Sequence, residues 1–172
     1  MSILDELVAA NTRYAGARPA RTLPMPPRRA VAIITCMDAR LDPARILGLE
    51  EGDAHVIRNA GGRAVESVRS LVISQRLLGT RAIALIHHTD CGMLTFSNAD
   101  LQARVRQELG QDVGGIDFLP FQDLRASVQE DVRLLAASPL LEPGTPIRGY
   151  IYDVHSGRLE EVERGVTAEC PA

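Results

Sequence analysis

The sequence contains no lysine, so all 19 of its basic residues are arginine. A chain without lysine cannot form a Schiff base with a carbonyl substrate or supply the lysine of a phosphate-binding P-loop, which excludes two large classes of enzyme. Tryptophan is also absent and aromatic residues make up only 3% of the chain, so a nucleic-acid surface that stacks bases on aromatic rings is not expected. The formal net charge of −3 points the same way, because binding to a phosphate backbone requires excess positive charge.

Cysteine is scarce, and long apolar runs are missing. The three cysteines are Cys36, Cys91 and Cys170, an odd number that makes a poor disulfide framework and favours a reducing compartment. The first 16 residues carry acidic side chains and no apolar core of the kind found in signal peptides. The longest apolar runs, such as 82–86, are far too short to span a bilayer. We therefore expect a cytoplasmic protein with no membrane-spanning segment.

Length and composition predict one globular domain. The chain has 172 residues, of which 45% are hydrophobic and 24% are charged, and this ordinary composition excludes wholesale disorder. The only break is a run with four prolines between positions 15 and 29, which cannot form a helix or a central strand. We therefore divide the chain into an N-terminal helix with a proline-rich arm (1–29), a single α/β domain (30–165) and a tail (166–172).

The segment from Ile3 to Tyr14 has the periodicity of an amphipathic helix. The apolar side chains near one face are Ile3, Leu4, Leu7, Val8 and Tyr14. A short helix at the end of a proline-rich arm must bury this stripe somewhere, and a second copy of the chain is a good candidate. The alternative is a frayed terminus.

After the arm, strand and helix patterns alternate. Short apolar runs predict strands at 30–36, 54–59 and 81–87, and helical patterns occupy 42–49, 63–78, 100–109 and 121–137. Residues 148–154 and 159–163 flank the turn residues Ser156-Gly157 and predict a β-hairpin. These units indicate an α/β fold, with a mostly parallel central sheet flanked by helices, an antiparallel edge strand and an N-terminal helical arm.

Reactive side chains follow two of the predicted strands, where the functional residues of open α/β sheets gather. The first strand continues into the sequence CMDAR (36–40), and the strand 81–87 continues into HTDCG (88–92). An extended segment would place residues 36, 38 and 40 on one side. Cys91 would lie at the start of a helical turn, whose amides and dipole favour a thiolate.

Cys36, His88 and Cys91 together predict a zinc site with one open position. Zinc takes tetrahedral nitrogen and sulfur ligands, and its catalytic sites keep three protein ligands. Two thiolates and an imidazole also suit zinc better than magnesium or calcium. Taken singly, a cysteine at a strand end is more often a small buried hydrophobe. The two cysteines could instead form a redox disulfide, but that would leave Asp38, Arg40 and His88 without a role.

The two motifs together resemble those of the β-class carbonic anhydrases, whose signature is C-x-D-x-R with H-x-x-C. The segment RNAG (58–61), which follows the second predicted strand, is similar to a matching segment of that family. The resemblance extends from about residue 24 to residue 154. The stretch before Cys36 lacks the glutamine of the plant-like branch, so the chain resembles the shorter, minimal branch.

This resemblance implies the reversible hydration of carbon dioxide to bicarbonate and a proton by zinc-bound hydroxide. Zinc supplies hydroxide near pH 7 because it lowers the pKa of bound water. Family members pair through N-terminal arms, so the resemblance also implies a homodimer or a dimer of dimers.

The resemblance assigns roles to the residues around the metal. Asp38 would accept the proton of the hydroxide, and in a closed, inactive state it would become a fourth metal ligand. Arg40 would hold Asp38 ionised through a forked ion pair. The backbone N–H of Gly92 would donate a hydrogen bond to the developing bicarbonate. Arg58 and Asn59 could line the substrate pocket or only shape a turn.

The remaining candidates carry less information. Asp90 lies between two ligands and could orient one of them. His87 should point to the opposite face from His88, into packing. His55 and His155 have the character of ordinary surface or strand histidines, although either could shuttle protons. Cys170 is expected in a loose tail.

Two other functions are compatible with the motifs. Hydrolysis of carbon disulfide or carbonyl sulfide would use the same zinc hydroxide in a narrow apolar pocket, as a relative of this family does. A non-catalytic zinc-binding protein is the other alternative. The presence of Asp38 and Arg40 argues against it, because a purely structural metal site needs neither.

Overall fold

A computed structural model describes residues 1–20 and 22–168 of the chain. Within these ranges, the helices are α1 (Ile3–Ala17), α2 (Pro43–Leu47), α3 (Val68–Arg76), α4 (Asn98–Leu109) and α5 (Leu124–Ala136). The strands are β1 (Val31–Cys36), β2 (Ala54–Asn59), β3 (Ala82–His88), β4 (Pro146–Tyr152) and β5 (Leu159–Val166). Three short 3₁₀ turns complete the assignment: η1 (Ala60–Gly62), η2 (Val65–Ser67) and η3 (Gly92–Leu94).

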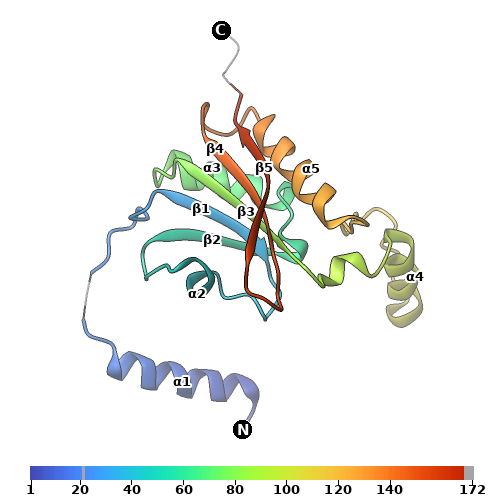
Figure 1. Ribbon diagram of the computed structural model, residues 1–172. Coiled ribbons are helices and arrows are strands. Elements are labelled where there is room, and N and C mark those ends of the chain that lie inside the picture. The colour runs from blue at the N-terminus through green and yellow to red at the C-terminus, as the bar shows by residue number, and fades with distance from the viewer. Residues whose placement is uncertain (21, 169–172) are drawn as a thin grey trace.

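The described strands form a single sheet in the order β2-β1-β3-β4-β5. The first three neighbouring pairs are parallel, and only β5 runs antiparallel, against β4. This arrangement confirms the predicted α/β fold with a mostly parallel sheet and an antiparallel edge strand (Figure 1). Because β1 and β3 are parallel neighbours, with Val31 beside Ala82 and Thr35 beside Ile86, their carboxyl ends open at the same edge of the sheet.

The main core lies between one face of the sheet and helices α3 and α5. Its buried side chains include Ala32 and Ile34 of β1, Leu85 of β3, Leu71 of α3 and Val128 of α5. The central strands are buried on both faces, as their nearly continuous apolar sequences predict for parallel strands. A second, smaller apolar cluster surrounds the cysteines at the carboxyl end of the sheet.

The loop after β2 passes unusually close to the end of β1. At Gly62, φ is +71°, and a Cβ atom would lie 3.0 Å from the backbone nitrogen of Cys36 and from the carbonyl carbon of Thr35. Glycine is required there for both reasons, because L side chains avoid this backbone region and the three atoms nearest to the missing Cβ belong to the backbone of β1. This close approach fixes η1 against the residue that ends β1.

Several predicted boundaries shift in the structure. The expected helix 63–78 is replaced by the turn η2 and the shorter helix α3, and the expected helix 121–137 begins at Leu124, where Asp123 caps it. We predicted that the tail starts at residue 166, but the ordered domain extends further along the chain. Val166 ends β5, Thr167 is buried, and the Ala168 N–H bonds to the Ala136 carbonyl. Cys170 lies outside the described residues.

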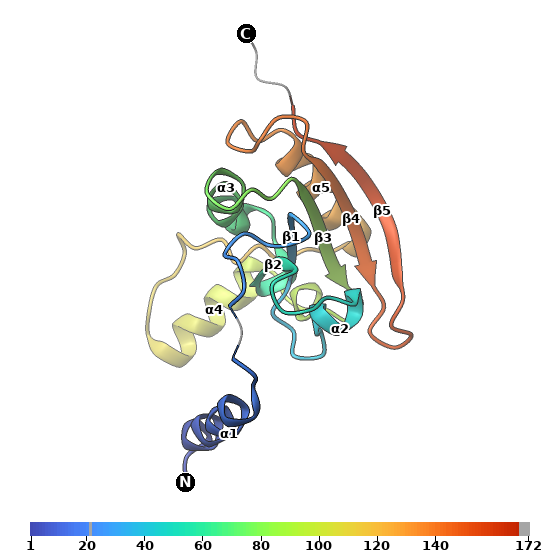
Figure 2. The same cartoon turned by 90° about the vertical axis from the view of Figure 1, so that its left-hand side faces the viewer.

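Helix α1 and the arm after it stand away from the sheet, as Figures 1 and 2 show. A capping box formed by Ser2 and Asp5 begins the helix, and none of its residues is buried. The arm joins the domain where Arg28 and Arg29 bind the fully buried carboxylate of Asp53. No helix in the described part of the chain is long and apolar enough to cross a membrane.

Replacing Gly62 by alanine should destabilise the protein more than the same change at Gly79. Both residues have φ of +71°, but a Cβ at Gly79 would meet nothing within 4 Å. Gly79→Ala therefore measures the backbone strain alone, about 1–2 kcal/mol. Gly62→Ala should lose at least about 1 kcal/mol more, because the methyl group must displace the backbone of β1. Urea unfolding of both metal-free variants gives the difference, and equal losses would show that the close approach costs nothing.

Candidate metal centre

Three side chains with metal-binding atoms converge at the carboxyl edge of the sheet. Cys36 ends β1, His88 ends β3, and Cys91 precedes the 3₁₀ turn η3. Their ligand atoms all lie within 4.8 Å of one another, and all three residues are buried. The structure therefore brings together the three residues that we predicted as metal ligands, although the two motifs that carry them lie some 50 positions apart in the sequence.

The orientation of the His88 ring fits a metal. Its Nδ1 lies 2.8 Å from the carbonyl oxygen of Thr89, and because a carbonyl oxygen can only accept, Nδ1 must carry the proton. The lone pair is thereby left on Nε2, which is buried and has no hydrogen-bond partner among the described residues. A buried, unpaired nitrogen is costly unless a ligand covers it. An imidazole held by a backbone carbonyl in this way is typical of metal-binding histidine.

A hydrogen bond between the two thiols shifts their pKa values in opposite directions. The hydrogen bond from Cys91 lowers the pKa of Cys36 to about 4. The same hydrogen bond, together with burial, raises the pKa of Cys91. A metal binds both sulfurs as thiolates, so metal binding releases any proton that the pair still holds. Both cysteines are free of disulfides.

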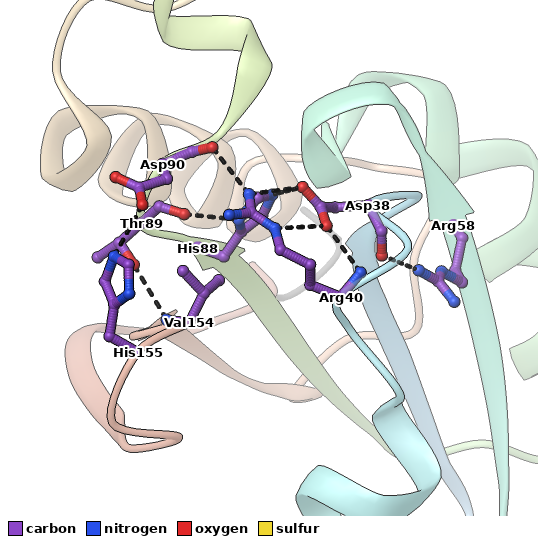
Figure 3. Close-up of polar contacts among 8 residues, drawn as sticks. All are labelled: Asp38, Arg40, Arg58, His88, Thr89, Asp90, Val154 and His155. Carbon is purple, nitrogen blue, oxygen red and sulfur yellow. Dashed lines mark hydrogen bonds and ion pairs between the residues drawn. The ribbon is translucent and has the colours of Figure 1, made fainter.

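Asp38 and Arg40 form a forked ion pair beside the three residues (Figure 3). Arg40 donates from Nε to Oδ1 at 3.0 Å and from a terminal nitrogen to Oδ2 at 2.8 Å, and its backbone N–H also binds Oδ1. These hydrogen bonds hold the pKa of Asp38 well below its usual range. Asp38 Oδ2 lies 3.8 Å from His88 Nε2, but Asp38 is not part of the three-residue cluster. The structure thus shows the carboxylate bound to Arg40.

Asp90 connects this pair to the turn between β4 and β5. Its carbonyl oxygen accepts a hydrogen bond from Arg40 at 3.0 Å, and its carboxylate lies 2.8 Å from His155 Nε2 (Figure 3). The residue has φ of +54°, a left-handed conformation that Asp tolerates better than most residues. We predicted that Asp90 could orient a metal ligand. Its side chain instead contacts His155, and its main chain supports Arg40.

His87 points away from the site, as predicted. Its ring is fully buried, binds Ser127 through Nδ1 at 2.8 Å and stacks on Phe121 with a centroid distance of 5.5 Å. Its Nε2 lies 3.3 Å from Asp131, which also pairs with Arg63. Alternating side chains of one strand therefore serve different purposes, with His87 in a polar network under α5 and His88 at the candidate metal centre.

Arg58 and Asn59, the last two residues of β2, both bind the backbone of other segments. Asn59 uses its amide on the backbone N–H and carbonyl of Arg63 and on the hydroxyl of Ser67, which favours the turn-shaping interpretation over substrate binding. Arg58 binds the carbonyl oxygens of Cys36 and Asp38. Sequence reasoning missed this contact, because nothing in a motif indicates that an arginine binds the main chain.

Gly92 begins η3 and is exposed. The first N–H groups of a helical turn have no partner within that turn, and a Cβ at Gly92 would meet nothing within 4 Å. The space into which a side chain at this position would extend is therefore open, directly after Cys91.

The buried cluster of Cys36, His88 and Cys91 lies at the carboxyl edge of a mostly parallel sheet. This arrangement is typical of a metalloprotein whose ligands come from the ends of adjacent strands. A family model described as carbonic anhydrase matches residues 31–117. The beta-carbonic anhydrase 1 of Mycobacterium bovis is 46% identical over 164 residues, which cover 94% of this chain and 99% of the relative. The chain belongs to the β-carbonic anhydrase family, whose members are metalloenzymes.

A solved structure and a second relative are also similar to this chain. A crystal structure of carbonic anhydrase from Streptococcus mutans superimposes with a TM-score of 0.91 at 49% identity, covering 95% of this chain and 99% of that one. A carbon disulfide hydrolase of Saccharolobus solfataricus is 30% identical, covering 80% of this chain and 79% of the relative.

Proposed function

We propose that the protein is a zinc-dependent carbonic anhydrase that catalyses the reversible hydration of carbon dioxide to bicarbonate and a proton. The observation that carries this proposal is the convergence of Cys36, His88 and Cys91 within 4.8 Å, next to an Asp38 carboxylate that Arg40 holds in a fork. A structural metal site would be closed by a fourth ligand and would have no use for such a pair.

The donor set favours zinc, with Cys36, His88 and Cys91 as its ligands. Two sulfurs and one imidazole nitrogen are soft ligands, which select zinc over the oxygen-binding cations. Zinc held by these residues would lower the pKa of a water molecule towards neutrality and would so supply the nucleophile near pH 7. The two ligand cysteines must stay reduced, so we also propose that the protein works in the cytoplasm or another reducing compartment.

Three groups of the chain would act on the reactants. Asp38 Oδ2 would accept a hydrogen bond from the O–H of the attacking oxygen, which turns a lone pair of that oxygen towards carbon dioxide. Arg40 would keep Asp38 ionised and prevent its carboxylate from rotating. The backbone N–H of Gly92 would donate to the oxygen on which negative charge develops. In a closed state, Asp38 would leave Arg40 and become the fourth metal ligand.

The purified protein should contain about one zinc per chain, as expected for a site with three protein ligands. Cys91→Ala removes one of the two thiolates and should lose most of the metal, whereas the control Leu109→Ala changes an exposed side chain at the end of α4 and should retain it. Elemental analysis after dialysis against a zinc buffer measures both. Full zinc retention by Cys91→Ala would contradict the ligand assignment.

Asp38→Asn should retain zinc and lose most of the hydration activity, by about 10²–10³-fold, the usual loss when a hydrogen-bonding group that acts on the reacting atoms is removed. The carboxamide keeps the shape of the side chain, but it is uncharged and only one of its two terminal atoms can accept a hydrogen bond. Asp42→Asn is the control, because asparagine caps a helix as well as aspartate does. Stopped-flow hydration of carbon dioxide is the measurement.

The same preparations should be assayed with carbon disulfide. The 30% identical carbon disulfide hydrolase makes this the second candidate activity on an unchanged site. Turnover of carbon disulfide without hydration of carbon dioxide would replace the proposed substrate. Zinc binding without turnover of either substrate would favour a binding protein instead.

We further propose that the chain forms a homodimer, or a dimer of such dimers, in which α1 of one copy packs on the other. Five large apolar side chains of α1 are more than half exposed: Ile3, Leu4, Leu7, Val8 and Tyr14. Beside the free edge of β2, a groove of about 370 Å³ is lined by apolar side chains of β2 and α3 that include Val56, Ile57 and Ile73. An apolar helix on an extended arm and an apolar groove at an open sheet edge complement each other.

Leu7→Asp should weaken dimerisation, and so should Ile73→Asp on the other side of the proposed contact, because each puts a charge into an apolar interface. Leu109→Asp, on the exposed end of α4, is the control. Sedimentation or light scattering across a concentration series reports the association. A wild-type protein that stays monomeric and fully active would overturn the proposal, as would an unchanged dimer in both variants.

A further inference from the structure

Arg58 reaches from β2 to the segment that follows β1. In the sheet it lies beside Thr35, and Asn59 lies beside Cys36. From this position its Nε donates to the Cys36 carbonyl oxygen at 3.0 Å, and a terminal nitrogen donates to the Asp38 carbonyl oxygen at 2.7 Å. Figure 3 shows the second of these contacts and shows that Arg58 approaches Asp38 from the side opposite to Arg40.

The segment that Arg58 binds has little other support. The ladder between β1 and β3 ends with the pair Thr35 and Ile86. Beyond that point the backbone is tied to β2 by the Met37 N–H, which donates to the Asn59 carbonyl at 2.9 Å, and to its own turn by the Leu41 N–H, which donates to the Asp38 carbonyl at 3.0 Å. The Cys36 and Asp38 carbonyls face Arg58 together, so a single planar guanidinium sets the direction of two peptide groups.

The consequence concerns the side chains of the same two residues. Where alternate carbonyls of an extended segment face one side, the alternate side chains also share a side. The Cys36 sulfur and the Asp38 carboxylate do lie near a common point, since both are close to His88 Nε2. Rotation of either peptide group would separate the thiolate from the carboxylate. Arg58 opposes both rotations.

Two arginines thus hold Asp38 in different ways. Arg40 binds its carboxylate, whereas Arg58 binds the main chain and touches neither the carboxylate nor the sulfur atoms in any contact of the described structure. Arg40 fixes the carboxylate oxygens, and Arg58 fixes where the residue stands relative to Cys36.

We propose that Arg58 is a positioning residue for the metal centre, which fixes Cys36 and Asp38 as one rigid unit through its forked contact with their two carbonyl oxygens. This inference rests on the proposed function only in taking Cys36 as a metal ligand. It assigns the effect to the shape of the guanidinium rather than to its charge. Lysine carries the same charge but is a point donor that cannot reproduce a planar fork.

The variants Arg58→Lys and Arg58→Ala separate shape from charge. Arg45→Lys, on the exposed face of α2, is the control for the arginine-to-lysine change itself. Zinc affinity is measured by competition with a chromogenic chelator. Cobalt(II) loading adds a second readout, the intensity and position of the thiolate-to-cobalt absorption bands, which report ligand geometry independently of turnover.

Both Arg58 variants should bind zinc about 10- to 100-fold more weakly, the usual loss when a residue that holds a metal ligand in place is removed. Both should also shift the cobalt bands, while Arg45→Lys matches the wild type. Wild-type affinity and spectra in Arg58→Lys would show that charge suffices and would overturn the proposal, and so would unchanged values in Arg58→Ala. A wild-type protein that binds no zinc would instead refute the proposed function.

The wild-type protein offers a check that needs no variant and no metal. A hydrogen-bonded Nε–H exchanges with water more slowly than a free one. The Arg58 Nε–H should therefore exchange at least tenfold more slowly than that of exposed Arg45 in nitrogen-15 NMR spectra of the metal-free chain. Equal rates would show that the fork does not persist in solution, and the proposal would fail even if the Arg58 variants did not fold.

Discussion

The parallel pairing of β1 with β3 is the constraint on which the site depends. Parallel neighbours end at the same edge of a sheet, so the residue that ends β1 and the residues that end and follow β3 must meet there. Cys36, His88 and Cys91 meet without any of them belonging to a local motif that folds by itself. An antiparallel pairing of the same strands would send the cysteine of the first motif to the opposite edge from the second.

The site also depends on the alternation of side chains along β3, which decides which of its two histidines faces the cysteines. His87 and His88 are adjacent and chemically identical, but the pleat turns one towards α5 and the other towards the two thiols. His87 binds Ser127 through Nδ1, and its Nε2, which also has no hydrogen-bond partner among the described residues, lies 3.3 Å from the Asp131 carboxylate. His88 uses a backbone carbonyl for one nitrogen and keeps the other unpaired. The difference between a structural and a metal-binding histidine therefore lies in what each face of the sheet offers.

The periphery of the site is held by contacts that come from the flanking strands. Arg58 from β2 binds the segment after β1, and the turn after β4 binds the segment after β3 through His155 and through the Val154 N–H, which donates to the Thr89 hydroxyl. The segments after β1 and β3 lie beyond the last regular hydrogen bonds of the sheet. Hydrogen bonds that involve side chains hold them there instead. The sheet therefore continues to order the site beyond the last paired residue of its strands.

The sequence alone determined the kind of sheet, the three candidate metal ligands and the Asp38–Arg40 pair. These features depend on short-range patterns: apolar β-branched runs, a spacing of two between Cys36, Asp38 and Arg40, and a spacing of three between His88 and Cys91. Only the tertiary structure decided the roles of Arg58, Asn59 and Asp90, and only it showed β5 continuing through Val166. Those outcomes depend on which backbone carbonyl or side chain from a distant segment lies within 3 Å. No spacing along the chain encodes that, because such contacts exist only once the strands have been placed side by side.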